Sequence, residues 1–88
     1  MAKNHIDEVK HEIQELAIGN YKSYPEEYEK TPDEVNRSIE SLAKGYWDSR
    51  EDKEIARDER LGISLENYQE WTREAYTTFI AENAQSLN

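Results

Sequence analysis

Imidazole and carboxylate side chains are the groups in this chain that could do acid–base chemistry or bind a metal ion. Asp7, His11 and Glu15 recur every four residues, which places them on one face if the segment is helical. That spacing would suit a metal-ligand set or a general base. It is also the spacing of an ordinary surface Asp–His pair, worth a few tenths of a kcal/mol (roughly 0.2–0.5). We favour the surface pair, because the second histidine, His5, is six residues from His11 and points to another face.

Asp48, Asp52 and Glu54 have part of the spacing of a calcium-binding loop. Such a loop needs oxygen ligands at alternate positions and a glycine at its sixth, whereas Arg50 and Lys53 interrupt this segment. The sequence contains no phosphate-binding glycine loop and no cysteine, which excludes disulfides and cysteine-ligated zinc. We therefore predict a protein that is not an enzyme and that binds no metal and no cofactor.

Acidic residues dominate the composition: 20 aspartates and glutamates against 11 lysines and arginines give a net charge of −9. Such a chain repels nucleic acids and anionic lipids and attracts basic surfaces, although acidity can also serve solubility alone. The acids of residues 48–60 alternate with basic residues, which is typical of a self-neutralising helix surface. Those of residues 26–34 are opposed only by Lys30; they are Glu26, Glu27, Glu29, Asp33 and Glu34. This second group is our candidate partner-binding site.

Helical periodicity accounts for most of the chain. The strongest apolar stripe lies in residues 61–84 and consists of Leu65, Tyr68, Trp71, Thr72, Ala75, Tyr76, Phe79 and Ile80. A second stripe near the N-terminus consists of Ile6, Val9, Ile13, Leu16 and Ala17. We predict an all-α fold, a small three- or four-helix bundle, forming one domain over residues 1–88 with helices at about 5–18, 32–48, 50–60 and 65–84.

Capping residues set the boundaries of the first two helices. Asn4 can cap the first helix, and Gly19 suits the position just after its end. The segment Thr31-Pro32-Asp33-Glu34 combines an N-cap, a proline at the first helical position and the glutamate of a capping box. The second helix should therefore begin at Pro32.

The end of the second helix is predicted from the point where apolar residues stop recurring at helical spacing. Arg50 stands where the second helix needs an apolar residue, so we expect that helix to break near Asp48 and a third helix, capped by Ser49, to follow. The third helix has few residues to bury (Ile55, Ala56 and Leu61) and could instead continue the second. Gly62 should stop it, and Ser64 should cap the last helix, with Ile63 and Tyr68 at the spacing of a hydrophobic staple.

The connection of residues 20–31 contains Tyr21, Tyr24 and Tyr28 at helix-like spacing around Pro25. Proline forbids one regular helix through all three tyrosines but could begin a short helical turn. Two interpretations stay open: the tyrosines cover the core, or they form an exposed contact patch, since tyrosine gives contact area at low entropy cost. Trp47 could belong to the same patch, so all four aromatic residues join the candidate partner-binding site.

Residues 55–71, IARDERLGISLENYQEW, resemble a helix-turn-helix, the common DNA-binding motif. Leu61-Gly62-Ile63-Ser64 matches its turn, but Asp58 stands where the motif has a small residue. The resemblance implies DNA binding by the last helix, whose outward residues would be Glu66, Asn67, Gln69, Glu70, Arg73 and Glu74. Reading a groove first requires neutralising phosphates with lysine and arginine. The outward face of the last helix has one arginine and three glutamates, so it would repel the phosphates.

These observations favour a non-enzymatic protein–protein interaction module whose partner has a basic surface. It could be an acidic inhibitor that occupies the groove of a nuclease or other nucleic-acid-handling protein. Small acidic phage proteins directed against host defence, including anti-CRISPR proteins, are similar in size and charge, though no motif is shared. Two alternatives are a helix-turn-helix regulator or antitoxin-like protein, and an oligomeric structural or adaptor protein. Without cysteines, a signal-peptide core or an apolar run long enough for a membrane, the expected location is the cytoplasm.

Overall fold

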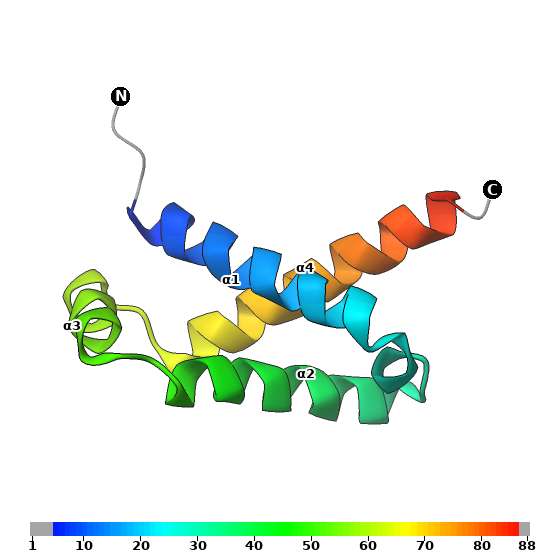
Figure 1. Ribbon diagram of the computed structural model, residues 1–88, viewed down its shortest axis with the longest axis horizontal. Helices are drawn as coiled ribbons and strands as arrows, with labels where there is room; N and C mark the ends of the chain where they lie inside the picture. Colours follow the sequence, from blue (N-terminus) through cyan, green and yellow to red (C-terminus); the bar gives the residue numbers. More distant parts are fainter. Residues whose placement is uncertain (1–4, 87–88) are drawn as a thin grey trace.

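The computed structural model describes residues 5–86 and the side chains of residues 5–82. Helices α1 (His5–Ser23), α2 (Pro32–Asp48) and α4 (Leu65–Ser86) form the body of the molecule. Helix α3 (Asp52–Leu61) lies at one end of that body, and a short 3-10 helix, η1 (Pro25–Tyr28), closes the turn between α1 and α2 at the other (Figure 1). The predicted all-α bundle is confirmed, and the cap expected at Asn4 lies outside the described residues.

Helix α4 is the centre of the fold, because both α1 and α2 pack against it. Tyr68, Trp71, Thr72, Ala75 and Phe79 are buried along its length, as their spacing predicts. The last turns of α4 diverge from α1 (Figure 1). That divergence explains why Ile80, predicted on the same stripe, is 44% exposed.

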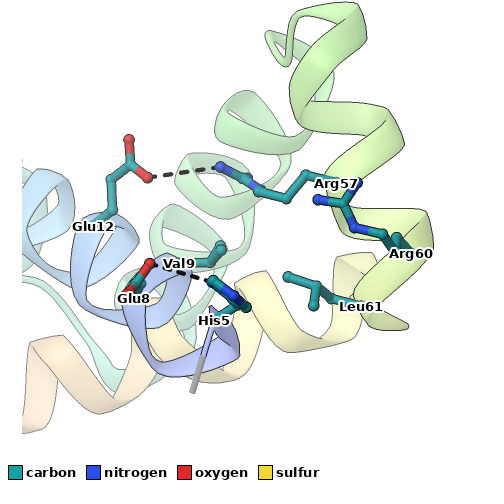
Figure 2. Close-up of a pocket in the computed structure, with 7 residues that line it drawn as sticks. All are labelled: His5, Glu8, Val9, Glu12, Arg57, Arg60 and Leu61. Carbon is teal, nitrogen blue, oxygen red and sulfur yellow. Dashed lines mark ion pairs between the residues drawn. The ribbon is translucent and has the colours of Figure 1, made fainter. Parts of the chain in front are cut away.

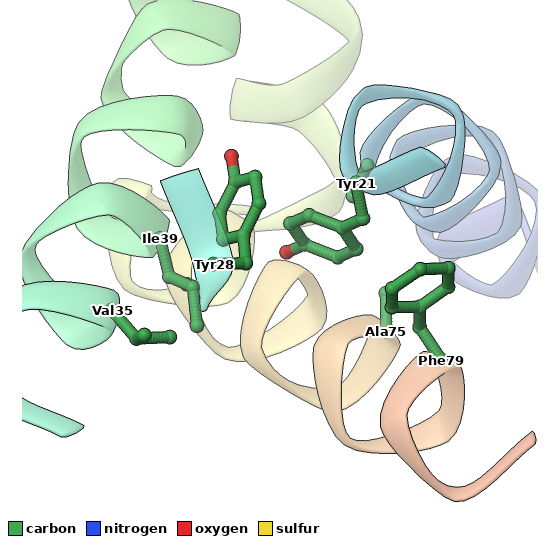
Figure 3. Packing of buried hydrophobic residues seen from close by; sticks show 7 residues of the cluster. Tyr21, Tyr28, Val35, Ile39, Ala75 and Phe79 are labelled. Carbon is green, nitrogen blue, oxygen red and sulfur yellow. The ribbon is translucent and has the colours of Figure 1, made fainter. Parts of the chain in front are cut away.

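Two apolar clusters pack on the two halves of α4. The first, shown in Figure 3, consists of Ala17, Tyr21, Tyr28, Val35, Ile39, Ala75 and Phe79. The second consists of Val9, Ile13, Ala43, Ile63, Tyr68 and Trp71. Ile63 and Tyr68 thus share a cluster, as the staple spacing predicts. Each cluster contains residues of α1, α2 and α4. No two of these helices could therefore bury their apolar faces without the third.

Helix α1 ends at Ser23 and not near residue 18 as predicted, because Gly19 lies inside it and does not end it. Glycine within a helix costs about 0.5–1 kcal/mol relative to alanine. The extra turn offsets this cost by placing Tyr21 on the same face as Ala17, where both are fully buried. Leu16, also predicted on the inner face, is 51% exposed. The buried residues of α1 are Val9, Ile13, Ala17 and Tyr21, which are four residues apart. This stripe is too narrow to include Leu16.

The junction between α2 and α3 falls where predicted, but different residues cap it. Helix α2 begins with the Thr31 cap, whose Oγ1 accepts from the Glu34 backbone N–H at 3.4 Å. Ser49 ends α2 and does not begin α3. The N-cap of α3 is Glu51, which forms a reciprocal capping box with Glu54. A glutamate can cap a helix as serine does, and Glu51 is one of several acids in this segment. The start of α3 could therefore not be recognised from the residue type alone. Ala56, expected to be buried in α3, is exposed.

Gly62 ends α3 as predicted, in the left-handed conformation with φ of 72°. The Ile63 N–H then donates to the Asp58 carbonyl at 2.8 Å, which closes the turn. Ser64 precedes α4, but its hydroxyl donates to the Asn67 side-chain oxygen at 3.1 Å and does not accept from a backbone N–H. The same oxygen accepts from the Ser64 N–H at 2.9 Å.

Burial of the core tyrosines predicts a loss of stability at high pH. Desolvation raises the pKa of Tyr21, Tyr28, Tyr68 and Tyr76 above the ordinary value, and it raises that of Tyr46 to about 12. The folded state therefore holds these phenolic protons more tightly than the unfolded state. Their contribution to stability is complete below pH 10, the ordinary tyrosine pKa, and is lost as the pH rises through about 12.

Tyrosinate absorbance and far-UV circular dichroism, followed together from about pH 9 to about pH 12.5, would test this expectation. The buried tyrosines should ionise only as helical signal is lost. Ionisation of all six tyrosines near their ordinary pKa, with helicity intact, would contradict it.

Candidate interaction surface

The five acids of residues 26–34 gather on one corner of the molecule, which we call the acidic corner. It consists of Glu26 and Glu27 on η1, Glu29 just after it, and Asp33 and Glu34 in the first turn of α2. All five side chains are exposed. Asp33 and Glu34 also lie at a helix N-terminus, where the helix dipole favours negative charge and lowers the cost of holding them together.

The backbone under the acidic corner is fixed by contacts with the core. Tyr28 is buried, and its hydroxyl donates to Asn20 Oδ1 at 2.7 Å. The Tyr76 hydroxyl of α4 donates to the Tyr28 carbonyl at 3.1 Å. Thr31 and Glu34 add a further tie, with Thr31 Oγ1 donating to Glu34 Oε1 at 2.9 Å. The acids therefore stand on an ordered frame and not on a free loop.

Basic side chains leave most of the acidic corner unpaired. Its one ion pair within the described residues joins Glu27 and Lys30 at 3.6 Å, whereas Glu26, Glu29 and Asp33 have none there. Acids along the helices are more often matched, as in Lys44–Asp48 at 3.0 Å. The other described acids that form no ion pair or side-chain hydrogen bond within residues 5–82 are Asp7, Asp52, Glu59, Glu66 and Glu70. Most of these belong to α3 and the start of α4, at the end of the molecule opposite η1 (Figure 1).

The four aromatic residues of the predicted site do not form one patch. Tyr21 and Tyr28 are core residues, 0% and 7% exposed, and so cannot contribute to a contact surface. Tyr24 is 60% exposed and adjoins Glu26 and Glu27 in sequence. Trp47 is half-buried at the far end of α2: its ring meets Tyr68 edge-on at 5.2 Å, and the Arg50 guanidinium carbon lies 3.3 Å from its centroid. Only Tyr24 remains beside the acidic corner.

Asp58 is a buried carboxylate that sequence reasoning placed on a solvated helix face. It is fully buried, and its Oδ2 accepts from the Tyr68 hydroxyl at 2.7 Å and from Arg50 Nη1 at 3.1 Å. Its Oδ1 accepts from Arg57 Nε at 3.0 Å. These bonds tie α3 to the end of α2 and to α4. The one available signal was its position in the helix-turn-helix pattern, where a small residue was expected.

The turn of the helix-turn-helix resemblance lies between α3 and α4. Of the predicted outward residues of α4, Glu66, Glu70, Arg73 and Glu74 are exposed, whereas Asn67 and Gln69 are half-buried. Residues 62–64 separate α3 from α4. The polar side chains of α4 contact both neighbouring helices: Arg73 Nη2 donates to Asn36 Oδ1 at 2.7 Å, and Glu74 lies 3.2 Å from Lys10 Nζ. Helix α4 therefore packs against both α1 and α2 and keeps a polar face exposed.

A hollow of about 410 Å³ separates the first turns of α1 from α3 (Figure 2). It is lined by His5, Glu8, Val9, Glu12, Arg57, Arg60 and Leu61. His5 Nδ1 lies 3.6 Å from Glu8, and Arg57 Nη1 lies 3.8 Å from Glu12. Two arginines and two glutamates balance, so the hollow favours neither anions nor cations.

The histidines pair with nearby glutamates, not with the predicted aspartate: His11 Nε2 lies 3.6 Å from Glu15. Between residues 5 and 86, no three histidine or carboxylate side chains are grouped so that they could hold a metal ion. The helices of that same range are all too short or too polar to span a membrane. The chain matches no known protein-family model, and no curated protein or solved structure is significantly similar to it.

Proposed function

We propose that the acidic corner binds a protein with a basic surface, and that the molecule acts as a non-enzymatic interaction module. The observation that carries this proposal is the set of exposed, unpaired carboxylates at Glu26, Glu29 and Asp33. An exposed carboxylate without an internal partner is free to meet a lysine or arginine of another molecule. A nucleic-acid-handling protein supplies such residues in a groove built for phosphates, and an inhibitor that occupies this groove would compete with the nucleic acid.

Pre-organisation supports the proposal as much as charge does. Because Tyr28 and Tyr76 fix the backbone beneath the corner, little conformational entropy is lost when a partner binds. Tyr24 adds an exposed ring beside the carboxylates, and an arginine can stack on such a ring while it pairs with an acid. Electrostatic attraction of this kind raises the association rate and depends on salt.

The charge of α4 weighs against the DNA-binding alternative. Its outward face carries Glu66, Glu70 and Glu74, and the one arginine there, Arg73, also lies 3.7 Å from Glu40. A duplex would meet repulsion on this face before any base could be contacted.

Charge reversal at Glu26, Glu29 and Asp33 to lysine is expected to weaken partner binding at least about tenfold. Each exposed ion pair contributes on the order of 0.5 kcal/mol, and three lost pairs give roughly the 1.4 kcal/mol of a tenfold change. The measurement is displacement of a labelled DNA duplex from a panel of purified basic nucleases, followed by fluorescence anisotropy at low and moderate salt. Displacement by the unmodified protein should weaken as salt rises.

The matched control reverses Asp7, Glu59 and Glu70, three exposed acids that also form no ion pair within the described residues and lie outside the corner. It changes the net charge by the same amount and should displace the duplex nearly as well as the unmodified protein. An equal loss in both variants would show that net charge alone acts. Absence of displacement from every nuclease would remove the inhibitor role.

A further inference from the structure

A second hollow, of about 330 Å³, lies between the first turns of α2 and the middle of α4. Its apolar lining is Pro32, Val35, Ile39 and Tyr76, and its polar lining is Lys30, Asn36 and Arg73. Val35 and Ile39 are core residues, 6% and 3% exposed, so they give the hollow a fixed apolar floor. Its volume lies within the roughly 300–1,000 Å³ of small-molecule sites.

The charged residues that line this hollow are opposite in sign to the net charge of the protein. Among the described residues that line it, the two charged ones, Lys30 and Arg73, are cations and none is a carboxylate, in a chain with 20 acids. The hollow beside α3, by comparison, is lined by two glutamates. Arg73 is held at the rim by its bond to Asn36 at 2.7 Å.

Each cation is already close to one acid, which limits the charge a ligand can bring. Lys30 lies 3.6 Å from Glu27, and Arg73 lies 3.7 Å from Glu40. Both cations remain about half exposed and keep further N–H groups open to a ligand. Each carboxylate of a ligand would also be repelled by Glu27 or Glu40. A ligand with one negative charge therefore suits the site better than a ligand with two.

We propose that this hollow binds a small molecule with an apolar body and a single carboxylate. The body covers Val35, Ile39 and the ring of Tyr76, where burial of apolar area drives association. The carboxylate meets the guanidinium of Arg73, whose planar N–H groups match its two oxygens, and Lys30 adds a weaker attraction. This site adjoins the acidic corner, because Lys30 pairs with Glu27 at 3.6 Å, but its ligand differs and its binding does not depend on the function proposed for that corner.

Octanoate, kept below its micelle concentration, is the probe, and its titration is followed by NMR of the methyl groups of Val35 and Ile39. Octanol and octylammonium carry the same chain with no charge and with a positive charge. We expect octanoate to bind best and octylammonium worst. Arg73→Gln should weaken octanoate binding about tenfold or more, as loss of a charge-assisted hydrogen bond does, and Arg73→Lys should fall between.

The control is Arg37→Gln, an exposed arginine on α2 that does not line the hollow; it should leave octanoate binding unchanged. Thermal unfolding checks that each variant is folded, and Lys30→Gln replaces Arg73→Gln if the latter is not. Octanoate that fails to shift the Val35 and Ile39 methyls would overturn the proposal. Equal binding of octylammonium, or equal effects of the Arg73 and Arg37 variants, would overturn it as well.

Discussion

Replacing Asp58 with alanine is expected to lower the free energy of unfolding by about 3–5 kcal/mol, the typical cost of removing one member of a buried ion pair. The carboxylate is fully buried, and its two oxygens accept from Arg50, Arg57 and Tyr68. Arg50 cannot turn to solvent when its partner is lost, because its side chain is only 10% exposed and its Nε donates to the Trp47 carbonyl at 2.8 Å. An uncompensated charge would remain inside the molecule.

Urea and thermal unfolding measure this effect directly. In a domain of this size about 1 kcal/mol corresponds to about 4–8 °C, so the midpoint should fall by roughly 12 °C or more. Small domains are stable by only about 5–15 kcal/mol in total, and the variant should be close to unfolding at moderate temperature. Amide exchange should be fastest in α3, which the Asp58 bonds attach to α2 and α4.

Glu59→Ala is the matched control, because Glu59 is the next residue of α3 and is exposed. Its effect should stay within about 0.5 kcal/mol, as for most surface substitutions. If the two variants were equally stable, the Asp58 carboxylate would contribute no more than a surface acid, and its network would not hold α3 in place.

The bundle and its helices could be predicted from sequence because they follow from repeating local signals. The stripe of α4, the N-cap at Thr31 and the left-handed Gly62 each depend on residues a few positions apart. The end of α1 could not be predicted in this way. Gly19 indicates a stop, and what overrides it is the burial of Tyr21 against α4, more than 50 residues further along the chain.

In the candidate site, too, local features could be predicted from the sequence and features that depend on tertiary packing could not. The acidic corner was visible because its carboxylates are close in sequence and outnumber nearby basic residues. Which tyrosines are exposed depends on tertiary packing: Tyr21, Tyr24 and Tyr28 have similar local sequence spacing but very different exposure. The role of Asp58 was hidden for the same reason, since Arg50 and Tyr68 are eight and ten residues away. Its local sequence is that of an ordinary charged helix.

Truncating Tyr21 to alanine should cost about 3–5 kcal/mol, as removal of a large buried aromatic side chain usually does. Tyr21 is fully buried, and its ring meets those of Tyr28 and Tyr76 edge-on at 4.6 and 5.5 Å. Its hydroxyl donates to the Thr72 carbonyl at 2.7 Å. One side chain thus joins the last turn of α1 to η1 and α4 (Figure 3), and its loss leaves a cavity among three elements.

Two further variants separate the contributions of the ring and the hydroxyl in urea unfolding. Tyr21→Phe keeps the ring and should cost only about 0.5–1.5 kcal/mol, the net value of one hydrogen bond. Tyr24→Ala removes an exposed tyrosine from the same segment and should change stability by about 0.5 kcal/mol or less. A Tyr21→Ala protein as stable as Tyr24→Ala would mean that the turn beyond Gly19 is not anchored in the core. The ordered frame beneath the acidic corner would then lose its support, because Tyr28 packs on the Tyr21 ring.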